Sequence, residues 1–250
     1  MVENYIANDQ LPYLTDKKYE EYVCWLDLMG TKSLMERSPT TCTIKICQLH
    51  NCLSTKKDTL GINNETLKIY PVMDGAFITS KNQSCLKKYL NLVFNSMAKD
   101  FIETERHLYQ SIIRACIAYG PLGHGSDIKS DKISGDYKKT LLFGLPMTQA
   151  YSSEKKAPPF GIYVDKSARA FSPSSNKPFT TRWHIWFESD YNAEKLMDEM
   201  KKLYNWAREM SFCLPYNEEV IELHEKSNKQ YLSYYINNPP KQRIISGEED

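Results

Sequence analysis

The stretch "YVCWLDLMGTKSL", residues 22–34, begins as an apolar run with the residue types of a buried strand and then reaches a carboxylate, Asp27. Gly30 follows three positions later. Burying an ionised carboxylate without a partner costs on the order of several kcal/mol, so Asp27 is expected where the strand ends. The stretch therefore predicts a strand over 21–28 that ends either in a helix-capping aspartate or in a metal or phosphate site.

The periodicity of apolar residues predicts the other elements. In chain order they are a helix over 31–55 broken near Pro39, two strands within 67–80 that meet at Asp74-Gly75, a helix over 83–107, a strand over 111–120, a short helix over 144–156, strands over 160–168 and 181–189, and two helices near 191–211 and 217–235. Between them, 124–139 is a polar stretch without a core pattern.

The order strand, helix, hairpin, helix, strand is that of a ferredoxin-like βαββαβ fold, which predicts an α+β protein. We expect one domain over 20–236. Its core covers about 20–170, and a further strand and helices over 180–236 are added at the C-terminus. Residues 1–19 are expected to form an N-terminal arm, and 237–250 a flexible tail.

This topology brings two acidic residues together. The first strand lies beside the hairpin, so Asp27 and Asp74 are expected at one edge of the sheet although they are 47 positions apart. Mg²⁺ is bound by one or two carboxylates together with substrate phosphates. Taken alone, Asp74 is the aspartate of an Asp-Gly hairpin. Taken together, the pair predicts a site for two Mg²⁺ or Mn²⁺ ions that serve in-line phosphoryl transfer.

Four motifs in sequence order resemble the class III nucleotide cyclase catalytic domain. They are "CWLDLMG" (24–30), "YPVMDGAF" (70–77), "IRACIAYGPLGHG" (113–125) and "LFGLPMTQAYSSEKKAPPFGIYVDKSA" (142–168). The chain is most similar to the bacterial pyrimidine cyclases of antiphage signalling. The resemblance implies a cyclase that converts UTP or CTP into the 3′,5′-cyclic monophosphate and pyrophosphate, as a second-messenger synthase in antiphage defence.

The resemblance also assigns roles to residues. Asp27 and Asp74 match the metal-binding aspartates of the family, and Leu28 is placed with them at the metal site. Asp27, Asp74 and Arg114 are the expected catalytic residues. The expected substrate-binding residues are Met29, Gly30, Thr31, Lys138 and Lys139.

The sequence departs from adenylate and guanylate cyclases at several places. Met73 stands where those enzymes have a glycine, and their transition-state Asn and Arg fall on Thr148 and Ser152. Arg114, or the lysines at 138 and 139, could supply the missing positive charge. For Arg114, an ion pair with a carboxylate is the alternative interpretation.

The family resemblance implies a homodimer. Its members work as head-to-tail dimers with shared sites, and 124–139 is long enough to reach the partner's site. The alternative is a surface loop with no role.

Composition excludes several classes of protein. The net charge of +1 would not recruit nucleic acid or an anionic membrane, and no apolar run approaches the ~20 residues that span a bilayer. The N-terminus lacks the basic and apolar regions of a signal peptide. The seven cysteines are an odd number, which suits reduced thiols. We expect a cytoplasmic protein with a nucleoside triphosphate as its partner, and without nucleic-acid or membrane partners.

Other conspicuous residues are interpreted as structural. His124 is expected to be a solvated loop residue without a role, and Lys155 and Lys156 a solvated helix end. Cys47 with His50 supplies only two potential ligands, fewer than a structural zinc site requires.

Two other functions compete with the cyclase. "WLDLMGT" resembles the nucleophile motif of haloacid dehalogenase phosphatases, but the general acid of that motif would fall on Met29, which cannot donate a proton. A catalytically inactive cyclase-like domain that binds nucleotide or a partner would explain the missing Asn and Arg. Turnover of nucleotide with Mn²⁺ separates these possibilities.

Overall fold

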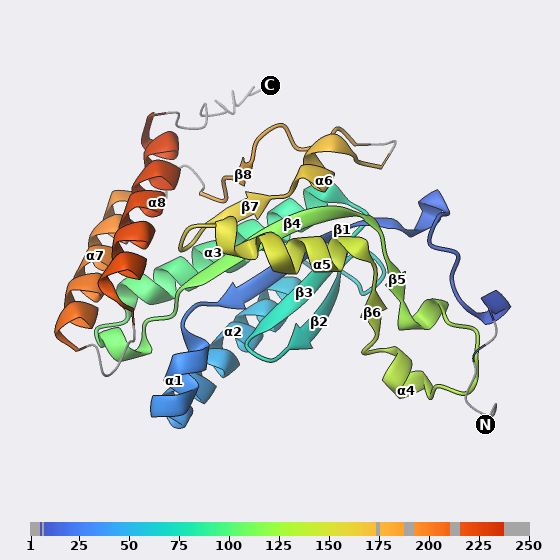
Figure 1. The fold of residues 1–250 in the computed structure, drawn as a ribbon, viewed down its shortest axis with the longest axis horizontal. Helices are drawn as coiled ribbons and strands as arrows, with labels where there is room; N and C mark the ends of the chain where they lie inside the picture. Colours follow the sequence, from blue (N-terminus) through green and yellow to red (C-terminus); the bar gives the residue numbers. More distant parts are fainter. Residues whose placement is uncertain (1–5, 7, 174–175, 188–192, 211–215, 238–250) are drawn as a thin grey trace, which may run out of the picture.

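The computed structural model describes residues 6, 8–173, 176–187, 193–210 and 216–237 (Figure 1). Its main elements are β1 (Glu20–Leu28), α1 (Thr31–Arg37), α2 (Pro39–Thr59), β2 (Lys68–Val72), β3 (Gly75–Ser80), α3 (Gln83–Glu103), β4 (Ile113–Pro121), β5 (Gly123–His124), α4 (Gly135–Lys138), β6 (Leu142–Phe143), α5 (Leu145–Ser153), β7 (Ile162–Val164), α6 (Lys166–Ala170), β8 (Trp183–His184), α7 (Ala193–Glu209) and α8 (Glu218–Asn237). The predicted tail lies outside the described residues, apart from position 237.

A six-stranded sheet in the order β2-β3-β1-β4-β7-β8 forms the centre of the fold. β1 is antiparallel to both of its neighbours, β3 and β4, whereas β7 is parallel to β4. The order β2-β3-β1-β4 is that of a ferredoxin-like βαββαβ fold with the first strand at its centre. The predicted α+β class is therefore confirmed, and β7, β8, α7 and α8 extend this core.

The side chains of β1 alternate between two apolar cores, because successive residues of a strand face opposite sides of the sheet. The larger core is formed with α2, α3 and α7, and the smaller one with α5. Tyr22, Cys24, Leu26 and Leu28 belong to the larger core, and Val23 and Trp25 to the smaller one. Asp27 continues the odd-numbered series, so it lies on the α5 side of the sheet.

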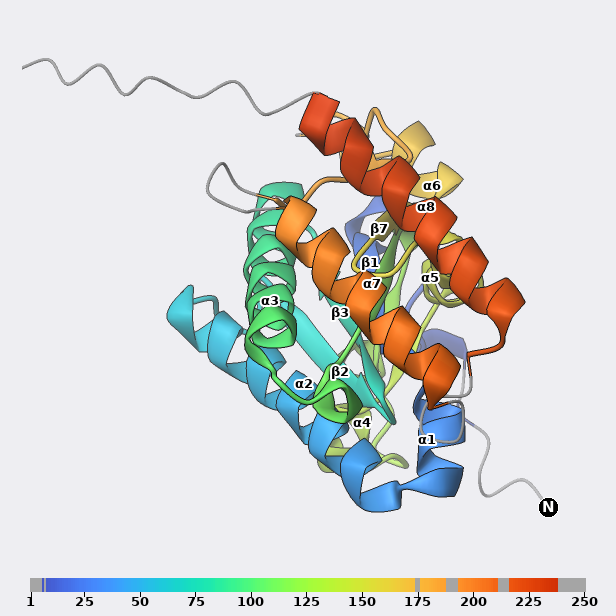
Figure 2. The same cartoon turned by 90° about the vertical axis from the view of Figure 1, so that its left-hand side faces the viewer.

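The C-terminal helices lie beside one end of the sheet. Figure 2 shows α7 and α8 side by side, with α7 next to α3. Both helices contribute buried apolar side chains to the larger core, among them Leu196, Leu203 and Ile221. These helices are therefore packed against the larger core.

Some predicted boundaries were correct and others were too long. The helix predicted over 31–55 is divided at Ser38, with Pro39 as the first residue of α2, as the sequence indicated. Of the strand predicted over 181–189, the described residues 181–187 contain only the two residues of β8. The strand predicted over 160–168 ends at Val164, because Asp165 accepts a hydrogen bond from the Ser167 amide at 2.9 Å and caps α6.

The polar stretch 124–139 is not a simple loop. It contains α4 and begins in β5, which pairs with β6 in a second, two-stranded sheet. It follows the Glu20 end of β1, since Glu20 pairs with Pro121 whereas Asp27 pairs with Arg114. Seven residue steps separate these two pairs, which is roughly 23 Å of strand. The stretch therefore lies at the end of the sheet opposite to Asp27 (Figure 1).

The expectation that His124 is solvated was wrong. Its side chain is only 4% exposed, with Nδ1 2.6 Å from the hydroxyl of Tyr70 and Nε2 3.1 Å from Oε1 of Glu21. The pairing of β5 with β6 folds the polar stretch back over the sheet. His124 is thereby buried between two strands that are distant from it in the sequence.

Candidate active site

Asp27 and Asp74 lie together, as predicted, at the end of β1. The residue paired with Asp27 on β3 is Gly75, next to Asp74, and the amide of Leu28 donates to the carbonyl of Asp74 at 3.3 Å. Gly75 is required there, because a Cβ at this position would lie 2.4 Å from the carbonyl oxygen of Leu26. The hairpin turn itself is Met73-Asp74, one residue earlier than the dipeptide that the sequence suggested.

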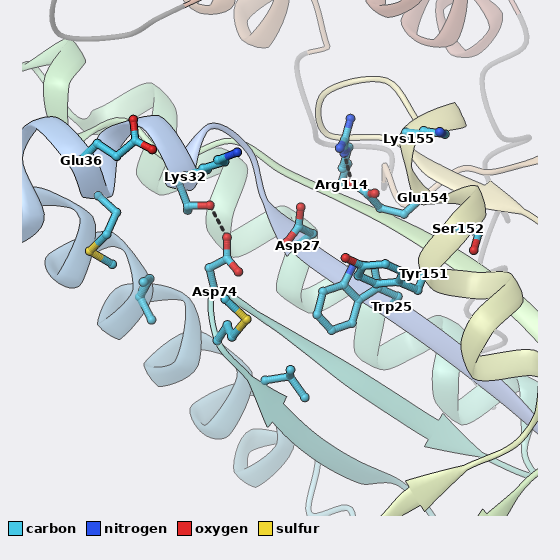
Figure 3. Close-up of a pocket in the computed structure, with 15 residues that line it drawn as sticks. Trp25, Asp27, Lys32, Glu36, Asp74, Arg114, Tyr151, Ser152, Glu154 and Lys155 are labelled. Atoms are coloured by element: carbon cyan, nitrogen blue, oxygen red, sulfur yellow. Dashed lines mark hydrogen bonds and ion pairs between the residues drawn. The ribbon is translucent and has the colours of Figure 1, made fainter.

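Both carboxylates open into a cavity of about 1030 Å³ (Figure 3). It is lined by Trp25, Asp27, Thr31, Lys32, Met35, Glu36, Ile46, Val72, Met73, Asp74, Arg114, Tyr151, Ser152, Glu154 and Lys155. These residues come from β1, α1, α2, the hairpin, β4 and the end of α5. The first strand and the hairpin hence contribute the two aspartates, whereas α1 and the residues after α5 each contribute a glutamate and a lysine, and β4 contributes Arg114.

The acidic residues at this end of the sheet are crowded. The pKa of the Asp27 carboxyl is raised to about 8, first by burial and then by the negative charges of Glu154 and Asp74, which outweigh the positive charge of Arg114. A divalent cation would relieve this repulsion and displace the proton from Asp27. Within the part of the chain that the structure describes, no three or more His, Cys, Asp and Glu side chains form a complete metal-binding group. Substrate phosphates and water would have to complete a Mg²⁺ site built on two aspartates.

Two further contacts hold the acidic groups in place. The hydroxyl of Thr31, at the start of α1, donates a hydrogen bond to Oδ2 of Asp74. Nε of Arg114 donates to Oε1 of Glu154 and forms an ion pair with it. In Figure 3, Asp27 lies between Asp74 on one side and the Arg114–Glu154 pair on the other. Arg114 is therefore ion-paired with a carboxylate, as the alternative interpretation expected, and it also lines the cavity. Its contribution of positive charge to catalysis stays a prediction.

Two residues near the aspartates have backbone conformations of the left-handed region. Gly30 has φ +80° at the start of α1. A Cβ on Gly30 would also lie 2.8 Å from the hydroxyl of Tyr216. Met73 has φ 51°, in the place where the resembling enzymes have glycine, and its side chain is 85% exposed. A non-glycine residue in this conformation is uncommon, and such strain is concentrated at functional sites.

The remaining predicted residues fall in different places. Leu28 buries its side chain in the larger core, so its main-chain carbonyl is the oxygen that it could offer a metal. Met29 also packs against this core, which leaves the phosphatase motif without its acid. Lys138 and Lys139 are at the opposite end of the sheet, where Lys139 forms an exposed ion pair with Asp136. They are not part of the site within one chain, and their role stays a prediction about a partner.

Several residues at the cavity were not predicted. Trp25 precedes Asp27 by two positions, so both lie on the same face of the strand. The alternation of the strand could therefore have predicted that Trp25 lies at the cavity. Lys32 follows the turn at Gly30, and Lys155 is exposed as expected yet reaches the cavity. Tyr151 lies with its ring 5.5 Å from that of Trp25, and together they form an aromatic wall.

A smaller cavity of about 320 Å³ adjoins the first one on the side of α8. The two cavities share Asp27, Thr31, Lys32 and Arg114. The smaller one is closed by Tyr216 and by His224 of α8, whose rings lie 5.4 Å apart. Burial raises the pKa of Tyr216 to about 12 against the opposing effect of the Arg114 charge. Burial and the same charge lower the pKa of His224 to about 4.

No protein-family model matches the sequence, and a search of curated proteins finds no match. Solved structures with a similar fold include a dimeric guanylyl cyclase domain of the RhoGC fusion protein from Blastocladiella emersonii, with a TM-score of 0.44 and 12% identity over 61% of this chain and 83% of that one. Adenylate cyclases from Trypanosoma brucei in their monomeric state match with a TM-score of 0.44 and 12% identity, over 68% of this chain and 80% of that one. The guanylate cyclase domain of RhGC from Catenaria anguillulae, in complex with GTP, matches with a TM-score of 0.42 and 14% identity, over 60% of this chain and 79% of that one.

These TM-scores are below 0.5, so the site is interpreted from the side chains of this chain. Among the described residues, no helix is long and apolar enough to cross a membrane. The six described cysteines are free thiols.

Proposed function

We propose that this chain is a metal-dependent nucleotide cyclase that acts on a pyrimidine ribonucleoside triphosphate. The observation that carries the proposal is the meeting of Asp27 and Asp74 at neighbouring strand ends, in one cavity with Lys32, Arg114 and Lys155. Asp27 and Asp74 can hold metal ions, and the three cations can hold a triphosphate; the other two carboxylates of the cavity are Glu36 and Glu154, of which Glu154 is paired with Arg114. In this reaction the ribose 3′-oxygen forms a bond to the α-phosphorus, pyrophosphate leaves, and the hydroxyl proton is released to water.

Asp27 and Asp74 would hold two Mg²⁺ or Mn²⁺ ions, with the carbonyl of Leu28 as a further ligand. When bound, these ions lower the pKa of the attacking hydroxyl and neutralise phosphate charge. Thr31 orients the Asp74 carboxylate through its hydrogen bond. Glu154 orients Arg114 in the same way, so that the guanidinium is fixed beside the cavity.

The missing Asn and Arg of ordinary cyclases have a substitute in this arrangement. Ser152 lines the cavity but has no charge. Lys32, Arg114 and Lys155 reach the cavity from three different elements and can stabilise the charge that develops on the leaving group. The ring of Tyr151, which is 60% exposed and lies edge to face with that of Trp25, offers a face on which a base can stack. The pyrimidine preference and the role in antiphage signalling rest on the resemblance of the sequence.

We also infer that the enzyme works as a homodimer. Four large apolar side chains at or beside the cavity are exposed, which suggests a surface covered by a second copy. They are Met35, Val72, Met73 and Tyr151. A second copy arranged head to tail would also bring Lys138 and Lys139 of one chain toward the cavity of the other.

The test is incubation with each of the four ribonucleoside triphosphates and Mn²⁺, followed by identification of the products by mass spectrometry. A cyclase gives a 3′,5′-cyclic monophosphate and pyrophosphate, with UTP or CTP as the better substrate. Binding of nucleotide without any product would support the inactive domain that the sequence left open. Release of orthophosphate would support a phosphatase.

A further inference from the structure

Met73 is the first residue of the two-residue turn between β2 and β3, directly before Asp74. Its φ is 51°, a conformation that a residue with a Cβ adopts only at a cost in free energy. The Met73 side chain is 85% exposed, so its own packing does not offset this cost. Strained conformations persist only where the surrounding structure fixes them. The turn therefore requires contacts to its main chain.

His50 of α2 supplies such a contact. Its Nε2 lies 3.3 Å from the carbonyl oxygen of Met73. A carbonyl oxygen only accepts hydrogen bonds, so Nε2 carries the hydrogen and donates it. α2 extends from Pro39 to Thr59, and its buried residues Leu49 and Leu53 belong to the larger core. The turn is thus tied to a packed helix rather than to another loop.

α2 also acts on Asp74 from a second direction. Sγ of Cys42 donates to the carbonyl of Thr31 at 3.6 Å, and the Thr31 hydroxyl in turn donates to Oδ2 of Asp74. His50 contacts the residue before Asp74, whereas Cys42 contacts the residue that holds its carboxylate. Two polar side chains of one helix therefore bear on the position of the same carboxylate.

His50 itself lies outside the larger cavity. Among the described residues, Met73 and Asp74 line that cavity and His50 does not. His50 lines a separate cavity of about 630 Å³, formed by residues of α2, of the loop after it and of β2. An effect of His50 on a ligand in the larger cavity must therefore pass through the main chain of the turn.

We propose that His50 is a positioning residue for the metal site. Its hydrogen bond holds Met73 at positive φ and keeps the Asp74 carboxylate where it can share a divalent cation with Asp27. Without this bond the turn relaxes in the metal-free chain, and part of the free energy of metal binding is used to restore it. The inference rests on the proposed function for the metal-binding role of Asp74, but Mn²⁺ binding can be measured without nucleotide.

The test is calorimetric titration of the full chain with MnCl₂ in the absence of nucleotide. His50→Leu removes the donor, and we expect it to raise the Kd for Mn²⁺ roughly fivefold, as for the loss of one hydrogen bond. His50→Gln keeps an amide donor and should bind Mn²⁺ like the natural chain. The matched control is Asn51→Leu, which places the same side chain at the neighbouring exposed position of α2 and should leave the Kd unchanged.

A substitution of Met73 tests whether His50 acts through the turn. Met73→Gly removes the cost of positive φ, so the turn no longer depends on His50. The double variant His50→Leu with Met73→Gly should therefore bind Mn²⁺ within about twofold of Met73→Gly alone. An equal loss of affinity in both backgrounds would show that His50 does not act through the turn, and it would overturn the inference.

Other outcomes separate this inference from the proposed function. The inference is overturned if His50→Leu lowers the melting temperature without changing the Kd, as a merely structural residue would, or if the natural chain binds no Mn²⁺. If a triphosphate is cyclised in either case, the cyclase stands. If no triphosphate is cyclised and yet Mn²⁺ binding depends on His50 through Met73, the cyclase proposal fails and the positioning of Asp74 stands. If His50→Leu does not fold, His50→Ala replaces it in both backgrounds.

Discussion

The acidic side chains at the two ends of β1 differ in their partners. At the Glu20 end, the Glu20 carboxylate accepts a hydrogen bond from the hydroxyl of Tyr119 at 2.9 Å, and Glu21 contacts both His124 and Lys81. At the other end, Asp27 is close to two more carboxylates and its pKa is raised to about 8. Paired charges stabilise a fold, whereas crowded charges beside a cavity cost stability and are expected where a ligand is bound. The comparison assigns the first end to structure and the second to function.

The largest expected effect is on turnover at the Asp27 end. Asp27→Asn and Asp74→Asn should each lower kcat at least roughly a hundredfold, the loss expected when a main electrostatic element of an active site is removed. The fold should remain intact, because the substitutions relieve repulsion. Steady-state kinetics with Mn²⁺ and circular dichroism measure both properties. Near-normal turnover in either variant would contradict the metal assignment.

The next effect is on the pH dependence of stability. With a pKa of 3.8 unfolded and about 8 folded, Asp27 binds more protons in the folded chain between these values. The free energy of unfolding without divalent ions should therefore fall as pH rises toward 8, by up to about 1.4 kcal/mol per pH unit from this group. Asp27→Asn should remove this slope, which urea unfolding in EDTA at pH 5, 6, 7 and 8 would reveal. Parallel curves for the two chains would show that the carboxyl is not perturbed.

At the Glu20 end, we expect a substitution to lower stability and to leave turnover unchanged. His124→Phe keeps the ring beside Tyr70 but removes the side-chain partner of the half-buried Tyr70 hydroxyl and one of the two partners of the buried Glu21 carboxylate. We expect a loss of about 2 kcal/mol in the free energy of unfolding. The kcat of the folded molecules should be unchanged, because Glu21, the β1 partner of His124, lies six residue steps, roughly 20 Å of strand, from Asp27. A lower kcat without a stability loss would contradict a purely structural role for the Glu20 end.

The smallest effect on stability is expected at Lys138 and Lys139, at the end of α4. Lys138→Ala together with Lys139→Ala should change the free energy of unfolding by less than about 0.5 kcal/mol, as is usual for surface positions. If sites are shared in a head-to-tail dimer, mixing this inactive double variant with Asp27→Asn should restore up to half of the natural activity, because one site then carries both lesions and the other carries none. No recovery from demonstrated heterodimers would exclude shared sites.

Local signals in the sequence predicted the core and the acidic pair. The alternation in residues 22–28 defined both faces of β1, Pro39 marked the helix break, and the Asp-Gly dipeptide located the hairpin to within one residue. Once the order of elements indicated a ferredoxin-like sheet, the meeting of Asp27 and Asp74 followed from topology.

The parts that could not be predicted depend on pairing between distant segments. His124 is buried because β5 pairs with β6 across the polar stretch, and short strands of two residues leave no periodic signal. The periodicity of 217–235 predicted α8, but not that His224 would line a cavity together with Arg114. That arrangement depends on how the C-terminal helices pack against the sheet, which is set by tertiary packing rather than by helix propensity.

The alternation of β1 restricts how this protein can change in length. An insertion or deletion of one residue between Tyr22 and Asp27 would exchange the two faces of the strand, turning Trp25 and Asp27 into the larger core and bringing Cys24 and Leu26 out of it. A change of two residues would preserve the faces but move Asp27 by one full repeat relative to Asp74. The central strand is thus fixed in both phase and length.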